Sequence, residues 1–179
     1  MKRIQLLAIG ETDAALLESL GPALAAEFGT RCEILQARLD PSPSLHPERG
    51  QYFSTEILDR MQRELAPDSG RLLGVTTLDL YIPILTFVFG EAHLNGACAV
   101  VSTCRLRQEF YGLPPDRRLL HERLIKEAVH ELGHTLGLTH CDDYRCAMAP
   151  SHAVELIDLK GSSLCPDCRA RSLTALAGA

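Results

Sequence analysis

The pattern in this chain best suited to chemistry is HExxHxxGxxH, which begins at His130. On a helix, His130 and His134 lie about 40° apart around the axis and about 6 Å apart along it, so both imidazoles can bind one ion. Glu131 stands beside them as a carboxylate that can accept a proton from a metal-activated water. Gly137 can adopt a positive φ that ends the helix and brings His140 back as a third ligand. Three neutral nitrogens leave a fourth position for water, which is typical of catalytic rather than structural zinc.

The alternative is an ordinary surface helix that carries histidines by chance. Apolar residues recur along the same stretch at helical spacing and define one buried stripe: Leu120, Leu124, Ala128 and Leu132, with Ile125, Val129 and Leu136 alongside. His130 and His134 point roughly 150–170° away from the centre of that stripe. We therefore expect them to face a cleft or solvent, and the rarity of the full pattern favours a metal site.

Four of the seven cysteines form a second cluster late in the chain. Cys141 and Cys146 are one pair, and Cys165 and Cys168 are the other. Two short pairs at this separation are typical of one tetrahedral zinc site made of four thiolates. A pair of disulfides and an iron–sulfur cluster are the alternatives.

The other three cysteines stand apart from this cluster. Cys32, Cys98 and Cys104 are expected to be buried structural thiols rather than ligands.

The first residues indicate a reducing compartment. Only a six-residue, mostly apolar run, Ile4–Ile9, precedes Glu11, and this is too short for the apolar core of a signal peptide. We therefore expect a cytoplasmic protein, which favours zinc over disulfides at the cysteines.

Length and composition narrow the classes of function. At 179 residues the chain suits one domain, residues 1–179, that buries about 70% of its extended surface. It is 46% hydrophobic, yet it has no apolar run near the ~20 residues that a membrane span needs. With a net charge of −5, 5% aromatic residues and no basic block, we expect no nucleic-acid partner. The oligomeric state stays open, with a monomer favoured.

Periodicity, caps and turn residues predict alternating strands and helices. The expected strands are 3–9, 31–37, 72–76, 86–89 and 97–102; the expected helices run from a Thr12 cap to about 28, over 54–65, from Asp116 to about 136, and from Pro166 onward. A proline-rich loop covers 40–50, and the loop 90–96 joins the last two strands. This order calls for right-handed crossovers and an α/β sandwich.

The histidine pattern, followed by a turn that carries Met148, resembles the metzincin metalloproteases. The cysteine spacings, together with Asp79-Leu-Tyr-Ile-Pro and Phe87-Val-Phe-Gly-Glu-Ala upstream, are similar to the archaemetzincin branch. The resemblance covers roughly residues 70–168. The segment Ala149–Leu164 is one residue shorter than the family pattern, and a loop tolerates such a deletion at little cost.

This resemblance implies a fold and a set of ligands. The fold is a twisted mixed sheet with two to three helices in an upper lobe (1–137), above a small zinc-stapled lower lobe (138–179), with a cleft between the lobes. His130, His134 and His140 would bind a catalytic zinc with Met148 in the turn beneath it. Cys141, Cys146, Cys165 and Cys168 would bind a second, structural zinc.

The chemistry expected of such a site is hydrolysis of a peptide bond in a peptide or protein substrate. Glu131 would act as the general base. Two alternatives remain, a zinc hydrolase such as an amidase that does not act on peptides, and a zinc-stabilised interaction module without turnover. The intact Glu131 counts against the second, because a binding module has no need of a base.

Three further residues or segments carry weaker expectations. Thr86–Glu91 could be an exposed edge strand that pairs with an extended substrate, or an ordinary core strand. Glu127 is a carboxylate that is either solvated or placed behind the metal ligands. His152, like the other isolated histidines, is expected at the surface.

Overall fold

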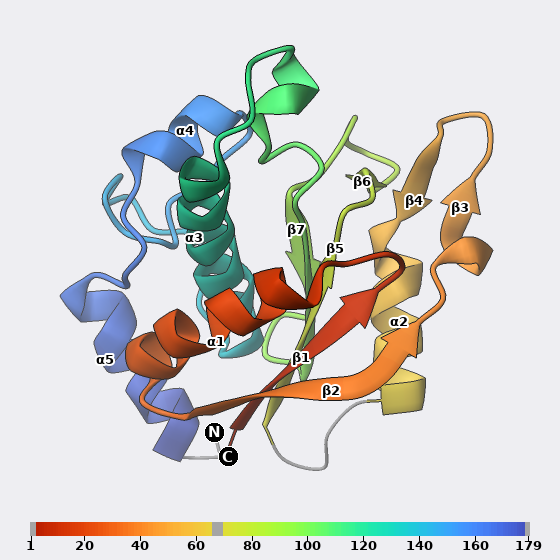
Figure 1. Ribbon diagram of the computed structural model, residues 1–179. Coiled ribbons are helices and arrows are strands. Elements are labelled where there is room, and N and C mark those ends of the chain that lie inside the picture. Colours follow the sequence, from red (N-terminus) through yellow and green to blue (C-terminus); the bar gives the residue numbers. More distant parts are fainter. Residues whose placement is uncertain (1–2, 66–69, 178–179) are drawn as a thin grey trace.

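A five-stranded twisted sheet with the order β2-β1-β5-β8-β7 lies at the centre of the fold (Figure 1). The computed structural model describes residues 3–65 and 70–177. The strands of this sheet are β1 (Arg3–Ile9), β2 (Arg31–Leu39), β5 (Arg71–Thr76), β7 (Gly90–Ala92) and β8 (Cys98–Ser102). The first four in spatial order are parallel, and β7 pairs with β8 in the antiparallel sense. The mixed α/β architecture expected from the sequence is confirmed.

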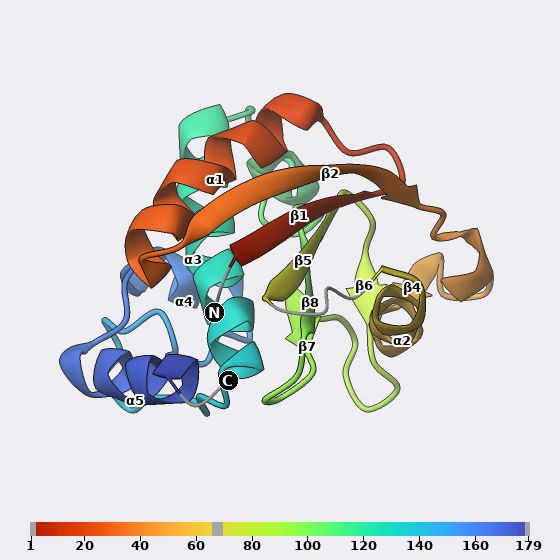
Figure 2. The same ribbon diagram turned by 90° about the horizontal axis from the view of Figure 1, so that it is seen from below.

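Helices cover both faces of this sheet (Figures 1 and 2). Helices α1 (Ala14–Phe28) and α3 (Arg117–Thr135) pack on one face, and α2 (Ser54–Leu65) packs on the other. Alternate residues of a strand point to opposite faces, so Leu73 joins the core under α1 and α3 while Leu72 joins the core under α2. Burial on both faces explains why β5 and β8 read as short, almost continuous apolar runs.

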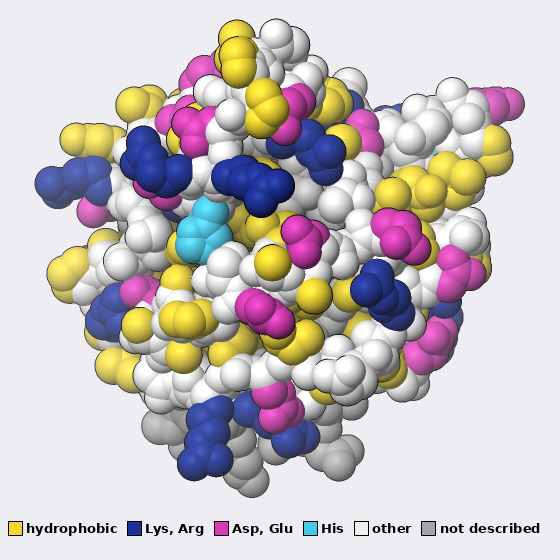
Figure 3. All heavy atoms as spheres, viewed as in Figure 1, with side chains coloured by type: hydrophobic (Ala, Val, Ile, Leu, Met, Phe, Trp, Pro, Cys, Tyr) yellow, Lys and Arg dark blue, Asp and Glu magenta, His cyan; other side chains and the backbone are white. Residues whose placement is uncertain are grey.

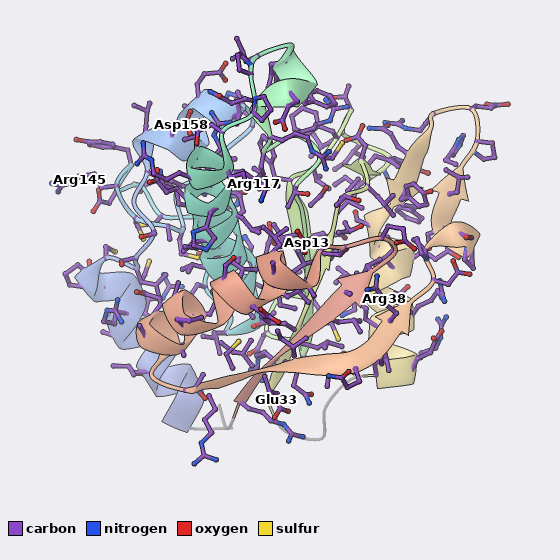
Figure 4. The ribbon with its side chains drawn as sticks, viewed as in Figure 1. Asp13, Glu33, Arg38, Arg117, Arg145 and Asp158 are labelled. Atoms are coloured by element: carbon purple, nitrogen blue, oxygen red, sulfur yellow. The ribbon has the colours of Figure 1, made fainter. Side chains whose placement is uncertain are left out.

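The cap of α1 differs from the expected one. Asp13, not Thr12, accepts a hydrogen bond from the backbone N–H of Ala15, and Figure 4 shows Asp13 at the start of α1. Thr12 is buried, and its hydroxyl bonds the carbonyl oxygens of Ile9 and Val75 instead. Both Thr12 and Asp13 have side chains that can cap a helix. Because the Thr12 hydroxyl is already bound to carbonyl oxygens of the sheet, Asp13 caps α1.

The strand expected at 86–89 is wrong, because the edge strand is Gly90–Ala92. Side chains hold the preceding segment: Arg49 donates to the carbonyl oxygens of Leu85 and Thr86, and Gln51 also donates to Thr86. Among the described residues, the only β pairing within 86–89 is an isolated bridge between Val88 and Leu80. Alternation of apolar residues cannot reveal that polar side chains from another segment bind the backbone.

Three short strands form a second sheet beside the first. They are β3 (Leu45–His46), β4 (Gln51–Phe53) and β6 (Leu80–Tyr81), and a 3-10 turn, η1 (Ser42–Ser44), precedes them. The expected loop 40–50 thus contains a turn and a two-residue strand, both too short to give a periodic signal. A further 3-10 turn, η2 (Gln108–Tyr111), leads toward α3.

The C-terminal part carries two helices, α4 (Val154–Leu159) and α5 (Pro166–Ala177). The second was expected, whereas α4 was missed because six residues are too few to show helical periodicity. Buried side chains of this part belong to the same core as α1 and α3, among them Ile157 and Leu164. Within the described ranges, no helix is both long and apolar enough to span a bilayer.

Charged side chains of both signs are mixed on the face that carries α1 and β2 (Figure 3).

Gly74 in β5 lets α2 pack close to the sheet. A Cβ there would lie 2.4 Å from Ile9 Cδ1 and 3.0 Å from Met61 Sδ. We predict that Gly74→Ala lowers the free energy of unfolding by about 1–3 kcal/mol through overpacking. Gly21→Ala, in α1, is the matched control, because its Cβ would meet only Cys32 at 3.9 Å. Gly21→Ala should be neutral or stabilise by up to about 1 kcal/mol in urea unfolding. Equal stability of the two variants would contradict this reading.

Candidate metal centre and its cleft

Helix α3 carries the first two histidines of the pattern and the glutamate. Asp116 caps its start by accepting a hydrogen bond from Leu119 N–H at 2.9 Å, as expected. At its other end Gly137 has φ +80°, and its N–H bonds His134 O at 2.9 Å. The chain therefore turns back directly after the helix, which brings His140 to the same side as His130.

The three imidazoles converge on one point. The ring centroids of His130, His134 and His140 are 4.7, 5.3 and 5.2 Å apart, and one nitrogen of each lies within 4.8 Å of the others. The Nε2 atoms of His130 and His134 are 3.1 Å apart. Two nitrogens at about 2.0–2.1 Å from a tetrahedral zinc would be about 3.3 Å apart, so the spacing fits this ion.

The outer nitrogens of two rings are fixed by backbone carbonyl oxygens. His130 Nδ1 donates to Ala147 O at 2.9 Å, and His134 Nδ1 donates to Leu138 O at 2.8 Å. A carbonyl oxygen can only accept, so both Nδ1 atoms carry the proton and both Nε2 atoms present a lone pair. Burial lowers the pKa of both rings, that of His130 far below its ordinary value with the Lys160 charge adding to the effect. Neutral rings whose lone pairs point inward have the protonation state that a metal ion requires of histidine.

Glu131 is buried beside the three histidines, with 5% exposure. Burial and, second, the charge of Glu127 raise its pKa well above the ordinary value. The edge strand leaves room for it only because residue 90 is glycine: a Cβ on Gly90 would lie 2.7 Å from both Glu131 Cγ and Oε1. Gly90 was not identified as a functional residue from the sequence, since no motif rule connects it to Glu131.

Glu127 is not solvated, contrary to one of the two readings left open. It is 3% exposed, and its Oε1 lies 2.7 Å from Nζ of the equally buried Lys160. Sequence reasoning missed Lys160, which is 30 residues from His130 and belongs to no recognised pattern.

A cleft of about 670 Å³ opens onto the histidines. Its walls come from three segments: residues 85–92 and 94 around β7, four residues of α3 from Glu127 to His134, and residues 139–140 and 150–152 of the C-terminal part. His152, expected as an isolated surface histidine, is exposed and lines this cleft. Strand β7, at the edge of the five-stranded sheet, forms part of its wall.

Met148 lies in a buried turn behind the metal centre, as expected. A Cβ on Gly133 of α3 would lie 2.4 Å from Met148 Sδ, so the glycine allows the turn to approach the helix. The residues Ala147, Met148 and Ala149 are all buried.

The four late cysteines form a compact cluster next to His140. The sulfur atoms of Cys141, Cys146, Cys165 and Cys168 lie within 4.8 Å of one another, and Cys141 Sγ is 3.8 Å from Cys165 Sγ. Zinc–sulfur bonds of about 2.3 Å would place tetrahedral sulfur atoms about 3.8 Å apart, so the cluster fits a structural zinc. All are free thiols, which disagrees with a pair of disulfides. Backbone N–H groups already point at the sulfurs, and that of Cys168 contributes most to a lowered pKa of Cys165.

The other three thiols lie outside this cluster. Cys98 is buried, whereas Cys32 and Cys104 are only half-buried, less than expected. Burial raises the pKa of Cys32 and Cys98 to about 11, so neither is a thiolate at neutral pH.

Comparison with known proteins identifies the family. The model of peptidase family M54 matches residues 44–174. An archaemetzincin from Methanocaldococcus jannaschii is 42% identical over 93% of this chain and 90% of its own length. One from Thermococcus kodakarensis is 37% identical over 97% and 96%.

Solved structures agree. The Archaeoglobus fulgidus archaemetzincin in complex with malonate superposes with a TM-score of 0.81 at 36% identity, covering 94% of this chain and 99% of that one. A zinc-dependent peptidase from Methanocorpusculum labreanum gives a TM-score of 0.84 at 30% identity, with coverage of 94% and 99%. This chain, with its histidine-lined cleft, therefore belongs to the archaemetzincins of peptidase family M54 and is a zinc metallopeptidase.

Proposed function

We propose that His130, His134 and His140 hold the catalytic zinc and that Glu131 is the general base for peptide hydrolysis. The observation that carries the proposal is the convergence of two Nε2 lone pairs, 3.1 Å apart, beside a buried carboxylate. When bound, zinc supplies a Lewis acid that polarises the scissile carbonyl and acidifies a water.

The residues of the chain then divide the remaining work. Glu131 accepts the proton of the water that attacks the carbonyl carbon, and it passes that proton to the amine as the C–N bond breaks. The products are a carboxylate and an amine. The backbone hydrogen bonds at His130 and His134 keep both rings oriented through this cycle.

An extended peptide is the substrate that suits the cleft. Phe89 O accepts from Ser102 N–H and His93 N–H donates to Cys98 O, so these backbone groups of the residues on either side of β7 point toward β8. By alternation, the backbone groups of Gly90 and Ala92 point to the open edge. A peptide can add there as a further strand with its scissile bond near the histidines.

The four cysteines would hold a second, structural zinc that fastens residues 138–179. Their sulfurs lie within 4.8 Å of one another, and the 3.8 Å between Cys141 and Cys165 supports this proposal because tetrahedral zinc would place them at about that distance. A metal staple suits a segment too small to build a large core.

The proposal also covers the lobes of the protein, its location in the cell and an alternative activity. We retain an upper lobe at 1–137, a lower lobe at 138–179, and a cytoplasmic, monomeric protein. A hydrolase of non-peptide amides would use the same ligands, and a screen of amide and peptide substrates separates the two.

Glu131→Gln should retain both metal ions and lose turnover by about 10²–10⁴-fold, because the amide cannot accept a proton. The measurement is peptide cleavage alongside metal content. Glu122→Gln is the matched control, since Glu122 lies on the same helix but pairs with exposed Arg118 at the surface. Wild-type turnover in Glu131→Gln would refute the assignment of the base.

Ala92→Pro removes an N–H that points to the open edge and breaks no bond to β8. We predict a loss in kcat/KM of about tenfold for peptides, with zinc content unchanged, because one substrate hydrogen bond is lost. An unchanged kcat/KM would show that substrates do not pair with β7.

Cys168→Ser should release one zinc per chain, measured by mass spectrometry, and lower the thermal midpoint by several degrees. Cys104→Ser is the control, because Cys104 lies outside the sulfur cluster and should leave two zinc ions bound. Two ions per chain in Cys168→Ser would contradict the four-thiolate site.

A further inference from the structure

Lys160 is a buried lysine that contacts the back of the metal centre. It follows α4 and is 3% exposed. Its Nζ lies 2.7 Å from Glu127 Oε1, donates to Ala149 O at 3.1 Å, and lies 3.5 Å from His130 Nδ1. His130 Nδ1 has its proton committed to Ala147 O, so the third contact is an approach without a hydrogen bond.

These contacts close a ring around the turn that carries Met148. Lys160 holds this turn at Ala149 O, and His130 holds it at Ala147 O. Glu127 lies one helical turn before His130 on α3, so the ion pair ties the same helix back to Lys160. Helix, lysine and turn therefore fix the direction in which His130 Nε2 points.

Docking of α4 onto α3 does not by itself require this lysine. Arg123 of α3 binds Asp158 of α4 through two hydrogen bonds, at 2.7 and 2.6 Å, and Figure 4 shows Asp158 on α4 beside α3. Lys126 adds bonds to the carbonyl oxygens of Ile157 and Asp158. A buried ion pair is in addition weak support for stability, because desolvation of both charges offsets their attraction.

We propose that the Lys160–Glu127 pair is a positioning device that aligns His130 for metal binding by fixing the Ala147–Ala149 turn. Neither residue needs to touch the reacting atoms. The inference rests on the proposed function, in which His130 is a ligand of the catalytic zinc.

The test compares Lys160→Met, the double variant Glu127→Gln/Lys160→Met, and Lys126→Met. The single change leaves a buried carboxylate without its cation, whereas the double change removes both charges and keeps similar volumes. Lys126→Met is the matched control, since it removes a lysine of α3 whose hydrogen bonds go to the carbonyl oxygens of Ile157 and Asp158. Three quantities are measured: the thermal midpoint of the metal-free protein, the zinc affinity of the histidine site, and kcat and KM for a peptide.

We expect Lys160→Met to lower the metal-free midpoint by about 10 °C. The double variant should recover most of that midpoint yet bind zinc at the histidine site at least tenfold more weakly. Its kcat should fall with KM nearly unchanged. For a spectroscopic measurement, a weak chelator removes zinc from the histidine site alone, and Co²⁺ then takes its place. The visible absorption of Co²⁺ bound to the double variant should be shifted relative to that of Co²⁺ bound to the wild-type protein. Lys126→Met should match wild type in affinity, kcat and spectrum.

A loss of zinc affinity below tenfold in the double variant would overturn the proposal, and so would a double variant that fails to fold. An equal loss in Lys126→Met would overturn it as well, because the effect would then be general loosening of α4. Should the wild-type protein cleave no peptide, the proposed function fails, while zinc affinity and the Co²⁺ spectrum still decide whether the pair positions His130.

Discussion

The hydrogen bonds from the backs of two imidazoles to backbone carbonyl oxygens are the constraint on which the site depends. Ala147 O and Leu138 O each accept from an Nδ1 atom, which forces the lone pairs of His130 and His134 toward each other. In a buried site, two facing acceptors 3.1 Å apart are unfavourable unless a cation lies between them. The backbone thus sets the orientation of both rings, and the loops that supply these carbonyl oxygens must be held as firmly as the helix.

Much of the surrounding structure can be understood as the means of holding them. Gly133 lets the Met148 turn approach α3, and Gly90 lets β7 approach Glu131. Ser54 and Thr55, at the start of α2, both donate to Glu91 of β7, at 2.5 and 2.8 Å, which ties the edge strand to the opposite face of the sheet. Close backbone approach and buried polar bonds therefore set the width of the cleft.

The sequence predicted the long elements well, for physical reasons, and the structure brings the residues expected as ligands together in two clusters. For helix α3, the apolar stripe, the Asp116 cap and the terminal Gly137 all indicate the same helix. Helix α2 was predicted over the bounds that the structure shows. Prediction failed where distant side chains decide the local backbone, as Arg49 and Gln51 do at Thr86. It also failed at Lys160, because periodicity cannot tell a lysine buried against a carboxylate from one at the surface. Motif spacing identifies ligands along a helix, but the groups that hold those ligands come from elsewhere in the fold.

The cysteine cluster and the histidine centre share a backbone and cannot be independent. Cys141 follows His140 in the chain, and its N–H donates to Met148 O at 3.0 Å. Met148 N–H in turn lies 3.4 Å from Cys146 Sγ, inside the cluster. An ion that fixes these sulfurs therefore also fixes the third histidine and one side of the Met148 turn, whereas Lys160 fixes the other side at Ala149. Met148 lies in a turn and not in a helix or strand. Contacts from other segments on both sides of the turn therefore define its position, in place of a regular hydrogen-bond ladder.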